Sequence, residues 1–407
     1  MTEYNISEEI DTIKRRNIIA LILCNLVNGL GIGMFQVVYQ PFILDQTGSI
    51  LITGIFVTIG AVLQFLPMPL IGKLSDRFGR KKILLMGIPI YILGLSFLII
   101  SSPVNLHFLI LGIIFFYLGF SINNLNSLIF VSENTNKSKG LTYGLIYFSY
   151  FVGTIGGNSF VFVGSEISSQ FFFLLYIGLF IILEIIYMFV LSDKFQIKKN
   201  RTLLENHSDG NLWHKIIQSP KAKAVLIFLS FDIFIYSISI SIYSAGLRDN
   251  YNITREQLAL LLLGFNISNM ISQIPAGHLT DKIGKMKSLV LSSLFGLGFF
   301  LLNILGFFLW SGGLVPFLFP VLLLSHVIFG FNVSTFIPSE QILLTDLDEA
   351  RKAESYGIVG FVRGIGYIPT GYIGGFLIEN VNYILPFILT SIGILFEIWY
   401  LIKYLQD

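Results

Sequence analysis

The feature that most constrains this chain is a series of long apolar runs separated by short polar breaks. A helix needs about 20 mostly apolar residues to cross a bilayer, and these runs reach that length. They are too long for strands and do not alternate with a period of two residues. The sequence therefore predicts an all-α membrane protein with 12 transmembrane helices in a lipid bilayer, at 17–44, 50–71, 83–101, 106–130, 141–163, 170–191, 223–247, 256–276, 288–309, 316–338, 355–377 and 383–405.

The composition excludes several other classes of protein. Hydrophobic residues make up 54% of the chain and charged residues 12%, about half of the charged share of an ordinary soluble domain. The net charge of +2 is too small for nucleic-acid binding by bulk electrostatics. The single cysteine, Cys24, allows no intrachain disulfide and no cysteine-based metal site. We expect no metal and no cofactor.

The basic residues predict the orientation of the helices. If the N-terminus is cytoplasmic, nearly all of the 26 Lys and Arg residues fall on the cytoplasmic side. Only Arg248 and Arg255 then fall outside, and Arg363 falls within a span. This asymmetry follows the positive-inside rule, so we expect a multi-pass protein of the cell membrane with both termini in the cytoplasm.

An internal repeat divides the chain into two halves. The segment GKLSDRFGRKK at 72–82 returns as GHLTDKIGKMK at 277–287, about half the chain later. Three more pairs follow in the same order: 132–133 with 339–340, 153–157 with 371–375, and 184–187 with 397–400. The repeat predicts two pseudo-symmetric six-helix bundles, 1–191 and 223–407, joined by a cytoplasmic loop at 192–222.

The first copy of the repeated segment resembles the loop motif of the major facilitator superfamily of secondary transporters. That motif reads approximately G-x-L-[AS]-D-R-x-G-R-[RK], and residues 72–81 match it throughout. The second copy carries Lys282 and Lys285 where the motif has arginines. The resemblance covers nearly the whole chain. It implies a monomeric transporter, not an enzyme, whose two bundles rock around a midplane cavity that binds a small-molecule substrate.

The motif residues also have a direct physical interpretation. A tight turn near a neighbouring helix favours small residues such as Gly72 and Gly79. Asp76 can face the positive N-terminal end of another helix, which the resemblance places near 354–357 at the start of span 11. Contacts of this kind form when the cytoplasmic side closes and break when it opens.

Basic residues of the motif can pair with an acid at the end of span 4. Arg77 and Arg80 can reach Glu133, and the repeat offers the lysines of the second copy to Glu340. The alternative is that Arg80 and the lysines after it only set topology. Asp346–Glu349 are expected to be solvated acids, not metal ligands. The predicted gating residues are Gly72, Asp76, Arg77, Gly79, Arg80, Glu133, Gly277, Asp281, Lys282 and Glu340.

Few ionisable residues lie within the spans, and each is a functional candidate because burial of a charge in a membrane is costly. Asp232 and Arg363 lie at similar depth in spans 7 and 11, which the resemblance makes neighbours. They are predicted to form a buried ion pair, either permanent and structural or broken during coupling by a proton or an anionic substrate. Glu184 and Glu397 are expected to snorkel from peripheral helices towards the interface.

The resemblance implies that spans 1, 4, 7 and 10 line the central cavity. Their polar residues predict a cavity rich in amide and aromatic groups, with one acid and one base. We expect about half of these amides to bond neighbouring helices instead. The substrate-cavity candidates are Asn25, Asn28, Gln36, Tyr117, Asn123, Asn124, Tyr236, Tyr243, His326 and Asn332.

Two modes of transport remain open. The leading hypothesis is proton-coupled efflux of amphipathic or drug-like compounds, favoured by the many aromatic residues. The alternative is uptake of a metabolite such as an organic anion or sugar, by symport or uniport. Phe115 stands where many proton-coupled members carry an arginine, and Ser149 and Thr154 depart from the drug-antiporter pattern. A membrane-embedded enzyme or sensor is the remote alternative. An ATP-driven pump lacks support because no phosphate-loop motif occurs.

Overall fold

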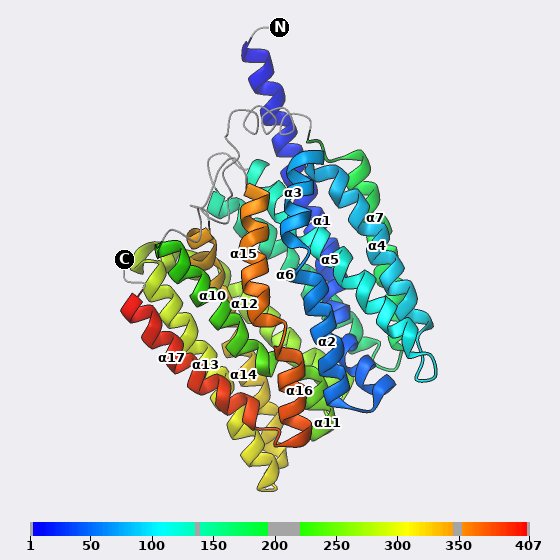
Figure 1. The fold of residues 1–407 in the computed structure, drawn as a ribbon, viewed down its shortest axis with the longest axis vertical. Coiled ribbons are helices and arrows are strands. Elements are labelled where there is room, and N and C mark those ends of the chain that lie inside the picture. The colour runs from blue at the N-terminus through cyan, green and yellow to red at the C-terminus, as the bar shows by residue number, and fades with distance from the viewer. Residues whose placement is uncertain (1–2, 135–138, 194–219, 345–351, 405–407) are drawn as a thin grey trace.

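The computed structural model describes residues 3–134, 139–193, 220–344 and 352–404, and every regular element within them is a helix. Two bundles of helices lie side by side (Figure 1). The first bundle contains α1 (Glu3–Thr47), α2 (Ile50–Phe65), α3 (Met68–Phe78), α4 (Arg80–Ile100), α5 (Leu106–Asn134), α6 (Lys139–Val163) and α7 (Ser169–Phe189).

The second bundle repeats this order of long helices. It contains α10 (Pro220–Ile240), α11 (Tyr243–Tyr251), α12 (Arg255–Ile283), α13 (Lys285–Ser311), α14 (Val315–Leu344), α15 (Lys352–Tyr367), α16 (Thr370–Asn380) and α17 (Leu385–Tyr404). In the described part of the chain, 11 helical segments are long and apolar enough to cross a membrane. The predicted span at 355–377 is not among these segments; α15 and α16, which are separated at Pro369, occupy it.

The two bundles meet through a small set of helices. Within the first bundle α1 packs on α6, and α4 packs on α5 and α7; within the second, α14 packs on α12 and α13. Across the boundary, α2 and α3 pack along α16 and α15, and α6 packs along α12. Helices α4 and α7 lie on the outer side of one bundle and α13 and α17 on that of the other (Figure 1).

Prolines break two of the boundary helices at matching places. Pro67 separates α2 from α3, and Pro369 separates α15 from α16, since proline lacks an N–H for the helical ladder. The breaks lie side by side, because the rings of Phe65 and Tyr367, just before them, are 5.5 Å apart.

Glycines allow the backbones of α2 and α16 to approach each other closely. A Cβ added to Gly54 would lie 2.1 Å from the carbonyl oxygen of Gly371, and one added to Gly371 would lie 2.5 Å from that of Gly54. Only a residue without a side chain fits at this separation. The contact joins the two bundles between the beginning of α2 and the beginning of α16.

The repeated motif is more helical than the predicted loop. Gly72 lies inside α3, and the turn between α3 and α4 is the single residue Gly79, with a φ of 95°. Gly284, between α12 and α13, has a φ of 85°. The turn at Gly79 is as tight as a turn can be, because one residue with positive φ is enough to separate the helices, and glycine adopts that conformation readily.

Candidate functional site

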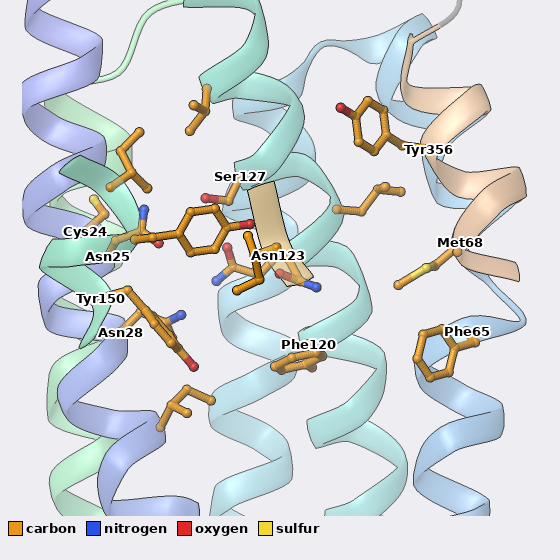
Figure 2. A pocket seen from close by; sticks show the side chains of 18 of the residues that line it. Cys24, Asn25, Asn28, Phe65, Met68, Phe120, Asn123, Ser127, Tyr150 and Tyr356 are labelled. Atoms are coloured by element: carbon orange, nitrogen blue, oxygen red, sulfur yellow. The ribbon is translucent and has the colours of Figure 1, made fainter. Parts of the chain in front are cut away.

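A cavity of about 380 Å³ lies between the two bundles. Helices α1, α5 and α6 supply most of its wall, and α14 and α15 supply the wall across from them. Figure 2 shows Asn25, Asn28 and Tyr150 on one side and Phe65, Met68 and Tyr356 on the other. The lining residues are Cys24, Asn25, Asn28, Ile32, Phe65, Met68, Tyr91, Phe120, Asn123, Asn124, Leu125, Ser127, Val131, Ile146, Tyr147, Tyr150, Phe151, Tyr187, Ile337, Glu340, Tyr356, Val359, Gly360 and Arg363.

The cavity wall combines amide groups with aromatic rings. Asn25 donates to the Leu21 carbonyl oxygen at 2.9 Å, and Tyr187 donates to Oδ1 of Asn123 at 3.2 Å. These bonds use part of each amide and hold it in place. Such a wall offers apolar contact over most of its area and a few fixed polar groups, as sites for small organic ligands do.

Four predicted cavity residues, Asn25, Asn28, Asn123 and Asn124, line the cavity. Gln36 and Tyr117 of the first bundle are outside its described lining. Tyr117 instead packs on Gly60 of α2 and on the ring of Tyr39, 6.0 Å away. Each helix turns only one face towards the cavity, and a role of these two residues towards a substrate stays a prediction.

The predicted cavity residues of the second bundle lie inside that bundle. Tyr243 donates to Oδ1 of Asn303 at 2.5 Å, and Nδ1 of His326 is 2.7 Å from the Leu322 carbonyl oxygen. Asn332 donates to the Ser292 carbonyl oxygen at 2.8 Å and, at 3.4 Å, to the hydroxyl of Tyr236. Tyr243 thus joins α11 to α13, and Asn332 joins α14 to α13 and α10. None of the four is in the described lining of this cavity, so their role towards a substrate stays a prediction.

Helix α6 supplies lining residues that the sequence analysis missed. Tyr147, Tyr150 and Phe151 all face the cavity. Their spacing of three and four residues puts aromatic rings on one side of a helix, and that was the available signal. The resemblance implied a wall made by spans 1, 4, 7 and 10, whereas α6, in the position of span 5, also contributes to it.

A buried charge cluster holds the junction of α3 and α4. Arg80 is 2% exposed at the first residue of α4, where a positive charge is unfavourable next to the helix dipole. Its Nη2 lies 2.5 Å from Oδ1 of Asp76 and 2.7 Å from Oε1 of Glu133, and its Nη1 donates to Ser75 at 3.1 Å. The two carboxylates thus compensate the buried guanidinium.

The pairing predicted for Glu133 is thus made by one of the two arginines. Arg80 makes it, whereas Arg77 is exposed and lies 5.5 Å from the centre of the Phe78 ring. Of the proposed partner of Asp76 at 354–357, the side chains of 354 and 355 lie outside the described residues, as does the acidic run 346–349. The Asp76 gating contact therefore stays a prediction.

The second copy of the motif does not reproduce this cluster. Asp281 and Lys282 are exposed at the end of α12, and nothing lies within 4 Å of a Cβ built on Gly277. Glu340, expected to pair with the lysines of this copy, accepts a hydrogen bond from Nη1 of Arg363 instead. The prediction for Glu340 was wrong because α15 brings the half-buried Arg363 closer than the lysines of the second copy.

Arg363 joins three helices of the second bundle at the cavity wall. Its Nη2 lies 3.9 Å from Oδ2 of Asp232 in α10, while its Nη1 binds Glu340 in α14. Both carboxyl groups are buried. The structure thus brings Asp232 and Arg363 together, with Glu340 as the closer partner that sequence reasoning missed. Whether the contact is permanent or breaks during coupling stays open at this point.

A third acid of this bundle lies deeper than expected. Glu397 of α17 is 1% exposed, and its Oε1 accepts a hydrogen bond from Ser293 of α13 at 2.7 Å. The expectation that Glu397 snorkels to the interface was wrong, because α17 turns this residue towards α10 and α13. Glu184, its counterpart in α7, is only half-buried.

Polar contacts tie the bundles together at the end of the molecule opposite the repeated motif. Gln40 of α1 donates to the Ser241 carbonyl oxygen at 2.8 Å and accepts from the amide of Ser244 at 3.1 Å. Arg248 pairs with Asp45 at 2.9 Å. Each contact joins a residue of the first half to one of the second, so the halves are closed here. We call Asp45, Gln40, Ser241, Ser244 and Arg248 the outer contacts.

Comparisons with known proteins agree with this architecture. The family described as Major Facilitator Superfamily matches residues 21–244 and 224–406. The chain is 22% identical over 292 residues to "Multidrug resistance protein 2" of Bacillus subtilis, covering 70% of this chain and 72% of that protein. It is 30% identical over 172 residues to "Quinolone resistance protein NorA" of Staphylococcus aureus, covering 42% of this chain and 40% of that protein.

Proposed function

Because the chain belongs to the Major Facilitator Superfamily, we propose that this membrane transporter exports amphipathic, drug-like organic compounds in exchange for protons. The observation that carries the proposal is the aromatic and amide-rich cavity between the two halves. Flat apolar rings accept many organic shapes, and scattered amides accept varied polar groups. The multidrug and quinolone resistance proteins to which the chain is similar support the same substrate class.

We place the protein in the cell membrane as a monomer, with both termini in the cytoplasm. The basic segments at 14–16, 72–82 and 277–287 support this orientation through the positive-inside rule. With this orientation the outer contacts close the external side, and α3 packs on α15 on the cytoplasmic side. In the proposal, substrate enters from the cytoplasm or the inner leaflet once α3 and α15 separate. Rocking of the two halves then exposes the cavity to the outside.

Asp232 is the proposed proton carrier. It is buried beside Arg363, which also contacts Glu340 and the cavity. When Asp232 takes a proton, its attraction to Arg363 is lost, and the guanidinium stays with Glu340. A change in the contacts among α10, α14 and α15 would thereby couple protonation to the position of the second bundle.

The cluster around Arg80 is the proposed cytoplasmic gating element. It fixes the end of α3, which packs on α15 across the boundary between the halves. Opening of the cytoplasmic side must separate α3 from α15. By holding α3 in place, the Arg80 cluster maintains the helix surface against which α15 packs in the closed state. Gly72 and Asp76 lie on the same helix and are part of this element.

The test uses inside-out vesicles that contain the protein and a pH-sensitive dye. After the vesicles are energised, lipophilic cations, organic acids and sugars are added one by one. We expect specific lipophilic cations to lower the proton gradient, and Asp232→Asn to abolish the response. Glu184→Gln, which alters a half-buried carboxyl group in α7, is the matched control and should respond as the unaltered protein does. A response to lipophilic cations that persists in Asp232→Asn would exclude Asp232 as the carrier.

Uptake of an organic anion is the second candidate, and one observation favours it. Arg363 is 26% exposed in its side chain and lies at the cavity wall, where it could bind a carboxylate. In this case organic acids, but not lipophilic cations, should change the gradient. Arg363→Gln should then abolish binding of the acid, and that result would replace efflux by uptake.

A further inference from the structure

Helices α10 and α17 run antiparallel, and three contacts fix their register. The rings of Phe231 and Phe396 are 5.2 Å apart. Thr390 donates to the Ile235 carbonyl oxygen at 2.9 Å, and a Cβ on Gly393 would lie 2.7 Å from the Ile235 side chain. This register brings the turn of α10 that contains Asp232 next to the turn of α17 that contains Glu397.

Glu397 has little to stabilise a negative charge. Its Oε1 accepts the single bond from Ser293, while its Oε2 is buried with no hydrogen-bond partner among the described residues. The neighbouring groups from the packed helices are the hydroxyl-bearing Ser293 of α13 and, on α10, Asp232 and Tyr236. A buried carboxylate with one neutral donor is costly, whereas a neutral carboxylic acid is not.

The charges around Arg363 add to the cost of a negative charge on Glu397. Arg363 contacts Glu340 and Asp232, so a single half-buried cation already faces two buried carboxyl groups. Glu397 adds a third acid, on the turn of α17 that the register places next to the turn of α10 with Asp232. Two carboxylates side by side cannot both ionise without a large penalty. One proton shared between Asp232 and Glu397 removes that penalty.

We propose that Glu397 is a second proton-binding residue of this transporter, which holds a proton as a neutral acid and passes it to Asp232. In this step the O–H bond on Glu397 breaks and one forms on the Asp232 carboxylate, so that the negative charge moves to Glu397 and no other reactant is needed. The inference deepens the proposed function and rests on it, because Asp232 is the carrier in both. It assigns α17 a role in coupling.

Infrared spectroscopy of the purified protein tests the proton on Glu397 without any substrate. A protonated carboxyl group gives a carbonyl band distinct from those of carboxylates and amides. We expect Glu397→Gln to lose one such band and Glu184→Gln, a carboxyl-to-amide control, to keep it. Should Glu397→Gln fail to fold, Ser293→Ala should shift the same band, because it removes the hydrogen bond to Oε1. A spectrum in which none of these changes affects the band overturns the proposal.

Exchange into D2O tests the transfer to Asp232. The Glu397 band should shift promptly in the unaltered protein and more slowly in Asp232→Asn, because the amide cannot pass a proton. Equal exchange rates in both would overturn the transfer step. Vesicle assays run in parallel separate the two ideas: if the unaltered protein moves no protons, the proposed function fails, and the infrared results still decide the state of Glu397. If protons move but Glu397→Gln has an unchanged pH profile of transport, the coupling role is excluded.

Discussion

Single residues determine the junctions on which both halves depend. Gly79 and Gly284 each form the entire turn between two long helices. Each glycine alone adopts the positive φ that reverses the chain direction. A side chain at this one position would therefore strain the backbone of the whole turn. The structure therefore predicts strong effects for small changes at these two places.

Gly79→Ala should destabilise the protein by about 1–3 kcal/mol, the cost of placing a side chain in a sparsely allowed backbone region. The measurement is the melting temperature in detergent, which should fall. Gly178→Ala is the matched control, because Gly178 lies within α7 with nothing within 4 Å of an added Cβ. Equal melting temperatures for the two variants would contradict the expectation.

Arg80→Ala should cost about 3–5 kcal/mol, because Asp76 and Glu133 lose the cation that compensates them in a buried site. Arg77→Ala should change the stability by less than about 0.5 kcal/mol, since Arg77 is exposed. The measurement is the melting temperature of each variant in detergent. The two arginines lie three residues apart in the same motif, so Arg77→Ala is the control for Arg80→Ala. A larger loss in Arg77→Ala would restore Arg77 as the principal partner.

At the scale of elements, helix pairs across the boundary depend on close backbone contact. The approach of α2 to α16 leaves no room for a side chain at Gly54 or Gly371. Gly371→Val should separate these helices and weaken closure of the external side. A cysteine pair introduced across α2 and α16 should then cross-link more slowly than in an otherwise unaltered protein. Unchanged cross-linking would show that the helices can adjust without separating.

The order and approximate bounds of the membrane spans could be predicted from the sequence, and the breaks within spans and the side-chain partners could not. Apolar runs report length along the chain, so spans were placed to within a few residues for most helices. The partner of Glu340 depends on which face of α15 carries Arg363, and a hydropathy pattern does not record that. The same holds for Glu397, since a carboxyl group near a helix end can face lipid or the bundle. Tyr147 and Tyr150 show the reverse case, in which helical spacing held the signal.

At the scale of the whole molecule, the outer contacts decide which side of the cavity is accessible. Gln40 bridges the halves through both ends of its amide. Gln40→Ala should therefore shift the population towards the state that is open to the outside. The reporter is Ser127→Cys in a Cys24→Ser background, since Ser127 lines the cavity and Cys24 is the single cysteine.

An impermeant thiol reagent should label this reporter faster from outside in Gln40→Ala than in the parent reporter protein. Labelling from the cytoplasmic side should slow in the same variant, because the two states exclude each other. A rise in labelling from both sides would instead indicate general loosening of the structure. No change from either side would mean that the ion pair of Asp45 and Arg248 holds the closure without Gln40.

The adjacent breaks at Pro67 and Pro369 change the mechanics of the boundary. Had α2–α3 and α15–α16 been continuous rods, parting them at one end would require the whole length of each to tilt. In this structure the boundary consists of two shorter helix pairs, α2 with α16 and α3 with α15. They meet at the two breaks, where Phe65 contacts Tyr367. One of these helix pairs can separate while the other stays packed. The adjacent breaks then serve as a hinge, and the two halves need not slide past each other along the whole boundary.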